Sequence, residues 1–132
     1  MTQSVLSVLI IEDEQVLAKN IGAYLRRYGY EVCIAYSAEA GLLELESFKP
    51  DAVLLDFNLP PGMNGLEALT KIRAIDPMIK VIMMTAYGSN ELALKAAQGG
   101  ACQFVTKPIS VSKLRQLIEE AVHDLPPDHT LI

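Results

Sequence analysis

Four short apolar runs in the sequence are each followed by side chains that could do chemistry. Such runs, bounded by turn-forming residues, are typical of strands buried on both faces of a parallel sheet. The carboxyl ends of parallel strands meet at one edge, which is where open α/β sheets bind ligands. We therefore expect the residues that follow these runs to lie close together. They are Glu12 and Asp13 after the first run, Asp56 after the second, Thr85 after the third and Lys107 shortly after the fourth.

The residue types at this predicted edge suit phosphoryl chemistry. Glu12, Asp13 and Asp56 would place three negative charges together. Two unit charges about 4 Å apart repel by roughly 4 kcal/mol at an effective dielectric constant of 20, so the cluster requires a cation. Lys107 is one candidate, and Mg²⁺, which prefers carboxylate and carbonyl oxygens, is the other. An aspartate beside Mg²⁺, with a lysine and the Thr85 hydroxyl nearby, is equipped for nucleophilic attack on a phosphoryl group.

The remaining sequence predicts the elements that would position these groups. Apolar residues at strand and helix spacing alternate five times along the chain, which predicts an α/β domain with a doubly wound five-stranded parallel sheet and five helices. We expect one domain over residues 1–123 and a C-terminal tail or the start of a linker over 124–132, where no periodic pattern continues. The predicted strands are 5–11, 31–36, 52–55, 80–84 and 102–105, and the predicted helices are 14–28, 38–48, 65–75, 91–98 and 111–123.

Composition excludes several classes of protein. The chain has 132 residues, 51% of them hydrophobic, which suits one folded domain rather than a disordered segment. No apolar run approaches the roughly 20 residues of a membrane helix, and no secretory signal is visible. The net charge of −5, without a basic cluster, argues against nucleic-acid binding by this domain. Cys33 and Cys102 have no metal or redox spacing, so we expect reduced thiols in a cytoplasmic protein.

Four segments together resemble a response regulator receiver domain (CheY-like) of two-component signalling. They are LIIEDE at 9–14, LLDFNLP at 54–60 with Gly65 after it, MMTAYG at 83–88 and FVTKP at 104–108. The resemblance covers residues 5 to about 123 and implies a flavodoxin-like fold with strand order 2-1-3-4-5. It implies a phosphorylation-dependent signalling switch that takes part in its own phosphoryl transfer and dephosphorylation, not a metabolic enzyme.

The resemblance also implies roles for individual residues. Asp56 would accept a phosphoryl group from a sensor histidine kinase or phosphotransfer protein. Mg²⁺ would be held by Glu12, Asp13, Asp56 and the backbone carbonyl of Asn58; Thr85 and Lys107 would contact the phosphoryl group, and Thr85 and Phe104 would be the switch residues. The fourth helix, fifth strand and fifth helix would then pass the signal to an effector domain or a homodimer partner, for instance in transcription regulation.

Two features depart from the usual pattern of this family. The first acidic position is Glu12 where aspartate is commoner, which lengthens the side chain by one methylene and keeps its charge. The turn after Asp56 carries an apparent extra residue around 60–62, so Gly65 falls one place late. This insertion leaves the loop conformation open, while the chemistry expected of Asp56 is unchanged.

Other functions remain open at this point and can be weighed on single residues. A haloacid-dehalogenase-like phosphatase or phosphotransferase would carry a second aspartate where this chain has Asn58. A flavin-binding carrier would need a hydroxyl- and glycine-rich loop where residues 12–14 are all acidic. A receiver-like module that no longer takes phosphate would not be expected to keep Asp56, Thr85 and Lys107. Taken alone, Glu14 would be a helix N-terminal charge and Phe104 a core residue.

Overall fold

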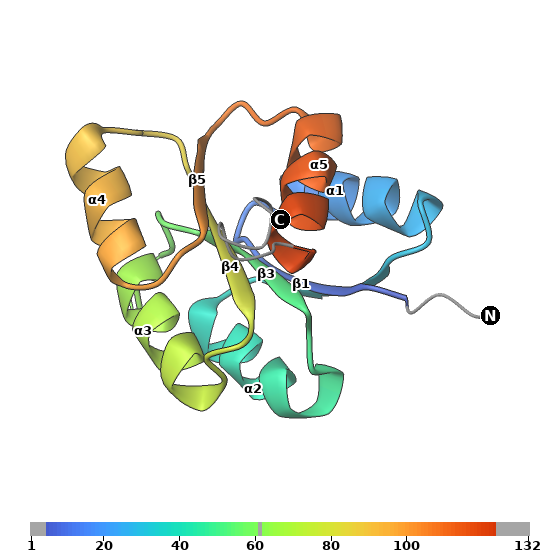
Figure 1. Cartoon of the computed structure of the whole chain (residues 1–132), viewed down its shortest axis with the longest axis horizontal. Coiled ribbons are helices and arrows are strands. Elements are labelled where there is room, and N and C mark those ends of the chain that lie inside the picture. The colour runs from blue at the N-terminus through green and yellow to red at the C-terminus, as the bar shows by residue number, and fades with distance from the viewer. Residues whose placement is uncertain (1–4, 61, 124–132) are drawn as a thin grey trace, which may run out of the picture.

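Five strands and five helices alternate along the chain (Figure 1). This computed structural model describes residues 5–60 and 62–123, so the predicted tail 124–132 and residue 61 of the predicted insertion lie outside the described residues. No helix within the described ranges has the length and apolar character needed to cross a membrane. In chain order the elements are β1 (Ser7–Ile11), α1 (Gln15–Arg27), β2 (Glu31–Ala35), α2 (Ala38–Phe48), β3 (Ala52–Asp56), α3 (Gly65–Ile75), β4 (Lys80–Thr85), α4 (Asn90–Gln98), β5 (Gln103–Thr106) and α5 (Val111–Val122).

The strands form one parallel sheet in the order β2-β1-β3-β4-β5, which confirms the predicted doubly wound fold. In the register of the sheet, Asp56 of β3 lies opposite Met84 of β4, and Thr85 lies opposite Thr106 of β5. β2 and β5 are the two edge strands, and β1, β3 and β4 lie between them. The carboxyl ends of β1, β3, β4 and β5 therefore meet at one edge, as the sequence predicted.

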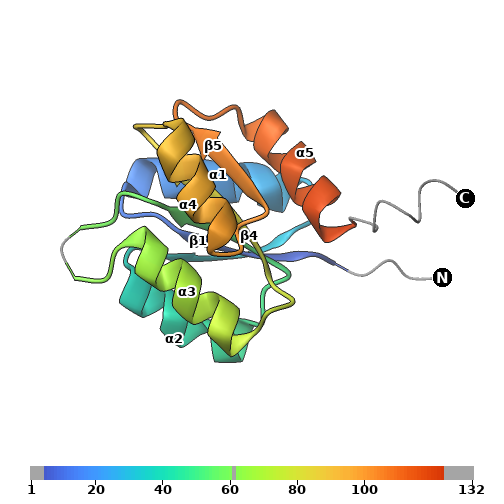
Figure 2. The same ribbon diagram turned by 60° about the vertical axis from the view of Figure 1, so that its left-hand side comes forward.

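Helices cover both faces of the sheet, as Figure 2 shows with α2 and α3 on one side and α1 and α5 on the other. Alternate residues of each strand point to opposite faces, so the buried strands supply two separate cores. Leu55 and Met83 belong to the layer beneath α2, α3 and α4, which we call the α2–α4 layer. Leu54 and Ile82 belong to the layer beneath α1 and α5, which we call the α1–α5 layer. The central strands are buried on both sides, as their unbroken apolar runs predicted.

The predicted helix starts are largely confirmed, and one of them shapes the loop beside Asp56. Ser37, Ser89 and Ser110 each accept a hydrogen bond at a helix N-terminus. Asn64 and Glu67 form the predicted capping box at the start of α3, with each side chain accepting a hydrogen bond from the other residue's backbone N–H. These caps fix where each connecting loop ends.

Two of the central strands extend further toward the site than the sequence indicated. β3 includes Asp56 and β4 includes Thr85, each one residue beyond its apolar run. The N–H of Phe57 donates to the carbonyl of Met84 over 2.7 Å, so the polar residues belong to the hydrogen-bonded sheet. Their side chains thus project from rigid backbone, while the end of β1 is the start of the loop that carries Glu12.

Candidate functional site

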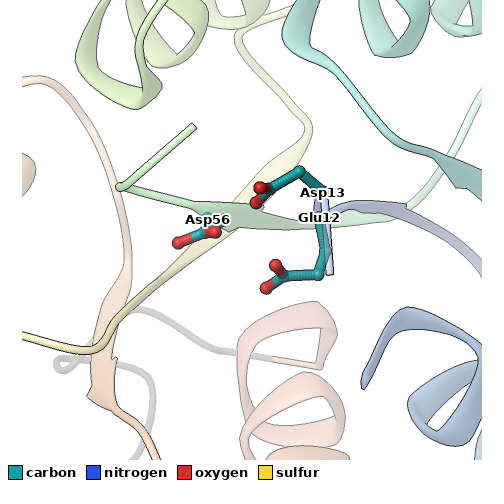
Figure 3. A group of neighbouring side chains, drawn as sticks. All are labelled: Glu12, Asp13 and Asp56. Carbon is teal, nitrogen blue, oxygen red and sulfur yellow. The ribbon is translucent and has the colours of Figure 1, made fainter. Parts of the chain in front are cut away.

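Three carboxylates converge at the predicted edge of the sheet. The ligand oxygens of Glu12, Asp13 and Asp56 all lie within 4.8 Å of one another, and Figure 3 shows the three side chains gathered at the ends of β1 and β3. Glu12 and Asp56 are buried, at 0% and 2% relative exposure, whereas Asp13 is exposed. The cluster therefore has two inner oxygen donors and one at its mouth. Such a set of hard, anionic ligands fits Mg²⁺.

Lys107 supplies the cation that the sequence analysis required. Its Nζ lies 2.8 Å from Oε1 of Glu12 and 3.4 Å from Oδ2 of Asp56. The Lys107 side chain is only 16% exposed, and its backbone N–H donates to the carbonyl of Thr85 over 2.7 Å. Glu14 also approaches, with its Oε1 4.0 Å from Nζ, but its side chain is 69% exposed. Lys107 is thus held by backbone pairing where it bridges the two buried carboxylates.

The pKa values of Glu12 and Lys107, the closest ion pair of the site, both differ from their ordinary values. Burial, together with the charge of Asp56, raises the pKa of Glu12 to about 7, although Lys107 and the N–H of Glu14 act to lower it. Burial acts to lower the pKa of Lys107, but the contact with Glu12 and the charge of Asp56 outweigh it, so the pKa lies above its ordinary value. Lys107 is therefore cationic at neutral pH, while Glu12 titrates near neutrality without metal.

The buried hydroxyl of Thr85 is connected to Asp56 through Asn58. Thr85 has 0% relative exposure, and its Oγ1 donates to Oδ1 of Asn58 over 2.7 Å. The same oxygen accepts a hydrogen bond from the N–H of Tyr87 at 3.1 Å. The N–H of Asn58 in turn donates to Oδ1 of Asp56 over 3.0 Å. The sequence predicted a backbone carbonyl of Asn58 as a metal ligand and an Asn58 side chain able to hydrogen-bond a water, but no sequence signal indicated this contact with Thr85.

Phe104 lies on β5, away from the carboxylates. It is half-buried, pairs in register with Met83 and packs against the α2–α4 layer. Beside it is a cavity of about 250 Å³ between α4 and β5, with Ala93 and Ala97 among its lining residues. The packing of the Phe104 ring against the core agrees with the expectation of a core residue. The cavity beside the ring leaves room for the movement expected of a switch residue.

Glu39 anchors the loop that contains the predicted insertion. It lies in the first turn of α2, and its Oε2 accepts a hydrogen bond from the N–H of Met63 at 3.0 Å. The sequence indicated only that an acidic residue suits a helix N-terminus. The contact spans 24 positions of the sequence, so no local pattern could have predicted it. Glu39 therefore ties α2 to the segment that leads into α3.

Comparison with known proteins gives a consistent result for the whole described domain. Residues 8–119 match the sequence model of the family described as "Response regulator receiver domain". Transcriptional regulatory protein ZraR of Salmonella typhimurium is 31% identical over 122 residues, which are 92% of this chain and 27% of that protein. A cyclic di-GMP phosphodiesterase of Thermotoga maritima is 34% identical over 119 residues, 90% of this chain and 32% of that protein. The chain thus spans about a quarter to a third of these relatives.

Solved structures agree with this result. A receiver domain protein described as CheY-like, from Methanospirillum hungatei, superposes with a TM-score of 0.85 at 33% identity, covering 90% of this chain and 94% of that one. The signal receiver domain of a LuxO repressor protein from Vibrio parahaemolyticus gives a TM-score of 0.83 at 30% identity, covering 90% and 91% of the two chains. Both structures therefore match this chain over nearly their full length.

Proposed function

The chain belongs to the family of response regulator receiver domains, and on this basis we propose that Asp56 is its phosphoacceptor. Receiver domains act in phosphorylation-dependent signalling rather than in metabolism. The donor would be a sensor histidine kinase or a phosphotransfer protein. The observation that supports Asp56 is its buried position within 4.8 Å of the Glu12 and Asp13 oxygens, with Lys107 Nζ at 3.4 Å.

The proposed reaction transfers a phosphoryl group between two side chains. A carboxylate oxygen of Asp56 attacks the phosphorus atom, the phosphorus–nitrogen bond to the donor histidine breaks, and its electron pair returns to the imidazole. Glu12, Asp13, Asp56 and the backbone carbonyl of Asn58 would hold Mg²⁺, which when bound supplies positive charge to the phosphoryl oxygens. Lys107 would contribute a second positive charge to the same oxygens.

The signal would leave the site through Thr85 and Phe104. A phosphoryl group adds about −1.5 to −2 charge and strong acceptor oxygens at Asp56. We expect the Thr85 hydroxyl to turn toward those oxygens and Phe104 to move at the boundary of the α2–α4 layer, where the cavity beside it gives room. The face of α4, β5 and α5 would then change its affinity for an effector domain or a homodimer partner.

The output itself is proposed from the relatives. Proteins named transcriptional regulatory proteins, ZraR and GlrR of Escherichia coli among them, match this chain over about 27% of their length. We propose that this chain likewise controls transcription through another domain or partner, because no basic cluster suits it to contact DNA directly. A cytoplasmic location, where thiols such as Cys33 and Cys102 stay reduced, is part of the same proposal.

Intact-mass measurement after incubation with acetyl phosphate and Mg²⁺ tests the proposed phosphoacceptor. We expect the wild type to gain the mass of one phosphoryl group, and Asp56→Asn to gain none. Asp51→Asn is the matched control, because Asp51 is an exposed carboxylate directly before the same strand and should leave labelling intact. Labelling of Asp56→Asn at the wild-type level, or undiminished labelling in excess chelator, would refute the proposal.

A further inference from the structure

The Thr85 hydroxyl has its single hydrogen committed to one acceptor. A threonine hydroxyl donates one hydrogen bond and accepts others. Here the acceptor is Oδ1 of Asn58 at 2.7 Å, and the hydroxyl oxygen accepts from the N–H of Tyr87. While this arrangement persists, the hydroxyl has no hydrogen left for a phosphoryl oxygen on Asp56. Asn58 and a phosphoryl group are therefore competing acceptors for the same donor.

The two partners differ in what they lose when this hydrogen bond breaks. Thr85 has 0% relative exposure, so its hydroxyl must find another acceptor inside the protein. Asn58 is exposed, so its released side-chain amide can bind water instead. The Asn58 backbone remains fixed by its N–H donation to Asp56 Oδ1. A new acceptor at Asp56 can thus replace Asn58 as the partner of the Thr85 hydroxyl with a small loss of free energy. Without that acceptor, breaking the hydrogen bond to Asn58 would leave the buried hydroxyl unpaired.

We propose that the Asn58 side chain is a positioning residue that holds Thr85 in the unphosphorylated arrangement until a phosphoryl group on Asp56 replaces it as acceptor. The inference rests on the proposed function, since it takes Asp56 as the phosphoacceptor and Thr85 as the switch. It adds a residue that sets the resting position of the switch. In this account the side chain of Asn58 opposes activation, while its backbone carbonyl serves the metal.

The test measures binding of beryllofluoride, a stable mimic of a phosphoryl group, to the whole chain in excess Mg²⁺ by NMR titration. Asn58→Ala removes the competing acceptor and leaves the backbone groups in place, so we expect binding about three to ten times tighter, the range of one net hydrogen bond. In a Thr85→Val background the same substitution should have no effect on affinity. In a Thr85→Ser background, which retains the hydroxyl, the tightening should return.

The pattern across backgrounds decides the proposal. An equal change in the presence and absence of the Thr85 hydroxyl, or weaker binding by Asn58→Ala, would overturn it, because Asn58 would then act through the metal or a water. Failure of the proposed function looks different: the wild type would bind no beryllofluoride and accept no phosphoryl group from acetyl phosphate. An equal change in both backgrounds, or weaker binding by Asn58→Ala, would contradict the positioning role of Asn58 while leaving Asp56 as the phosphoacceptor.

A second measurement needs neither phosphate nor its mimic. Three-bond couplings to the Thr85 methyl group report the rotamer of its side chain in the unmodified protein. We expect one rotamer in the wild type and a mixture in Asn58→Ala, with unfolding in urea confirming that the variant is folded. A Thr85 side chain that keeps its single rotamer in folded Asn58→Ala would show that Asn58 does not hold it.

Discussion

The ammonium group of Lys107 lies 2.8 Å from the carboxylate of Glu12, closer than to the proposed phosphoacceptor. The lysine therefore compensates the negative charge that a metal ion would otherwise neutralise. If Mg²⁺ were bound by the carboxylates, its charge would replace that of Lys107 beside Glu12, and the lysine would become available to a phosphoryl group on Asp56. On the proposed function, metal binding and the position of the lysine would thus be linked through one ion pair.

Removing the Lys107 charge should destabilise the metal-free protein. Lys107→Met leaves Glu12 and Asp56 buried without a cation, and we expect a loss on the order of 2 kcal/mol at pH 8 by urea unfolding in chelator. The loss should shrink at pH 5.5, where Glu12 can bind a proton. Lys113→Met, which removes an exposed lysine of α5, is the control and should change stability little. An equally small effect of Lys107→Met at pH 8 would show that Lys107 does not compensate the acids.

The raised pKa of Glu12 predicts a pH dependence with a definite sign. In chelator its pKa is about 7 in the folded protein and 4.5 in the unfolded chain, so between these values the folded state binds more protons. Its contribution to stability is therefore fully present below pH 4.5 and is lost as the pH rises to about 7. Compared with Glu12→Gln, the wild type should lose on the order of 3 kcal/mol over this range. Parallel pH profiles of the two proteins would contradict the shift.

Asp13 should matter for metal binding and little for folding. It is exposed at the mouth of the cluster, so Asp13→Asn in chelator should leave stability unchanged or raise it by up to about 1 kcal/mol, because repulsion is relieved. Mg²⁺ should raise the melting temperature of the wild type by binding the folded state, and this shift should largely disappear in Asp13→Asn. Glu46→Gln, an exposed acid of α2, should retain the full Mg²⁺ effect. Much earlier melting of Asp13→Asn in chelator would be the contrary result.

Gly65 should be required for the geometry of the site. A Cβ at this position would lie 2.7 Å from the carbonyl oxygen of Asp56 and from the Cα of Phe57, both backbone atoms that cannot move aside cheaply. Gly65→Ala should therefore lower stability and slow labelling by acetyl phosphate at least tenfold, since the loop after Asp56 must shift. Gly29→Ala is the control: φ there is +92°, so the variant is strained, but no atom lies near its Cβ and the site is distant. Its labelling should match the wild type.

The sequence predicted the sheet and most of the candidate site because both depend on local patterns. Unbroken apolar runs identified the buried strands, and capping residues such as Asn64 and Ser37 marked helix starts within a residue or two. Parallel strands meeting at one edge then brought Glu12, Asp13 and Asp56 together without further information. The residues that follow strands were predictable because strand order alone decides where they lie.

Contacts between side chains from separate loops were not predictable in the same way. The Asn58–Thr85 hydrogen bond and the contact of Glu39 with the N–H of Met63 depend on rotamers and loop paths that no periodicity encodes. Glu14 was interpreted as a helix N-terminal charge, and it does precede α1, yet its Oε1 also lies 4.0 Å from the Nζ of Lys107, a residue 93 positions further along the sequence. Such pairings follow from the folded backbone, so they appear only once the fold is known.

The two-layer core separates the residues proposed for phosphorylation from those proposed for partner recognition. Asp56 lies two residues after Leu54, whose side chain belongs to the α1–α5 layer, whereas Thr85 lies two residues after Met83, whose side chain belongs to the α2–α4 layer together with Phe104. Because strand side chains alternate, the proposed phosphoacceptor and the proposed switch residues belong to opposite faces of the sheet and meet only at its edge. We therefore expect substitutions around α4 to change which partner recognises the phosphorylated chain without impairing phosphorylation of Asp56.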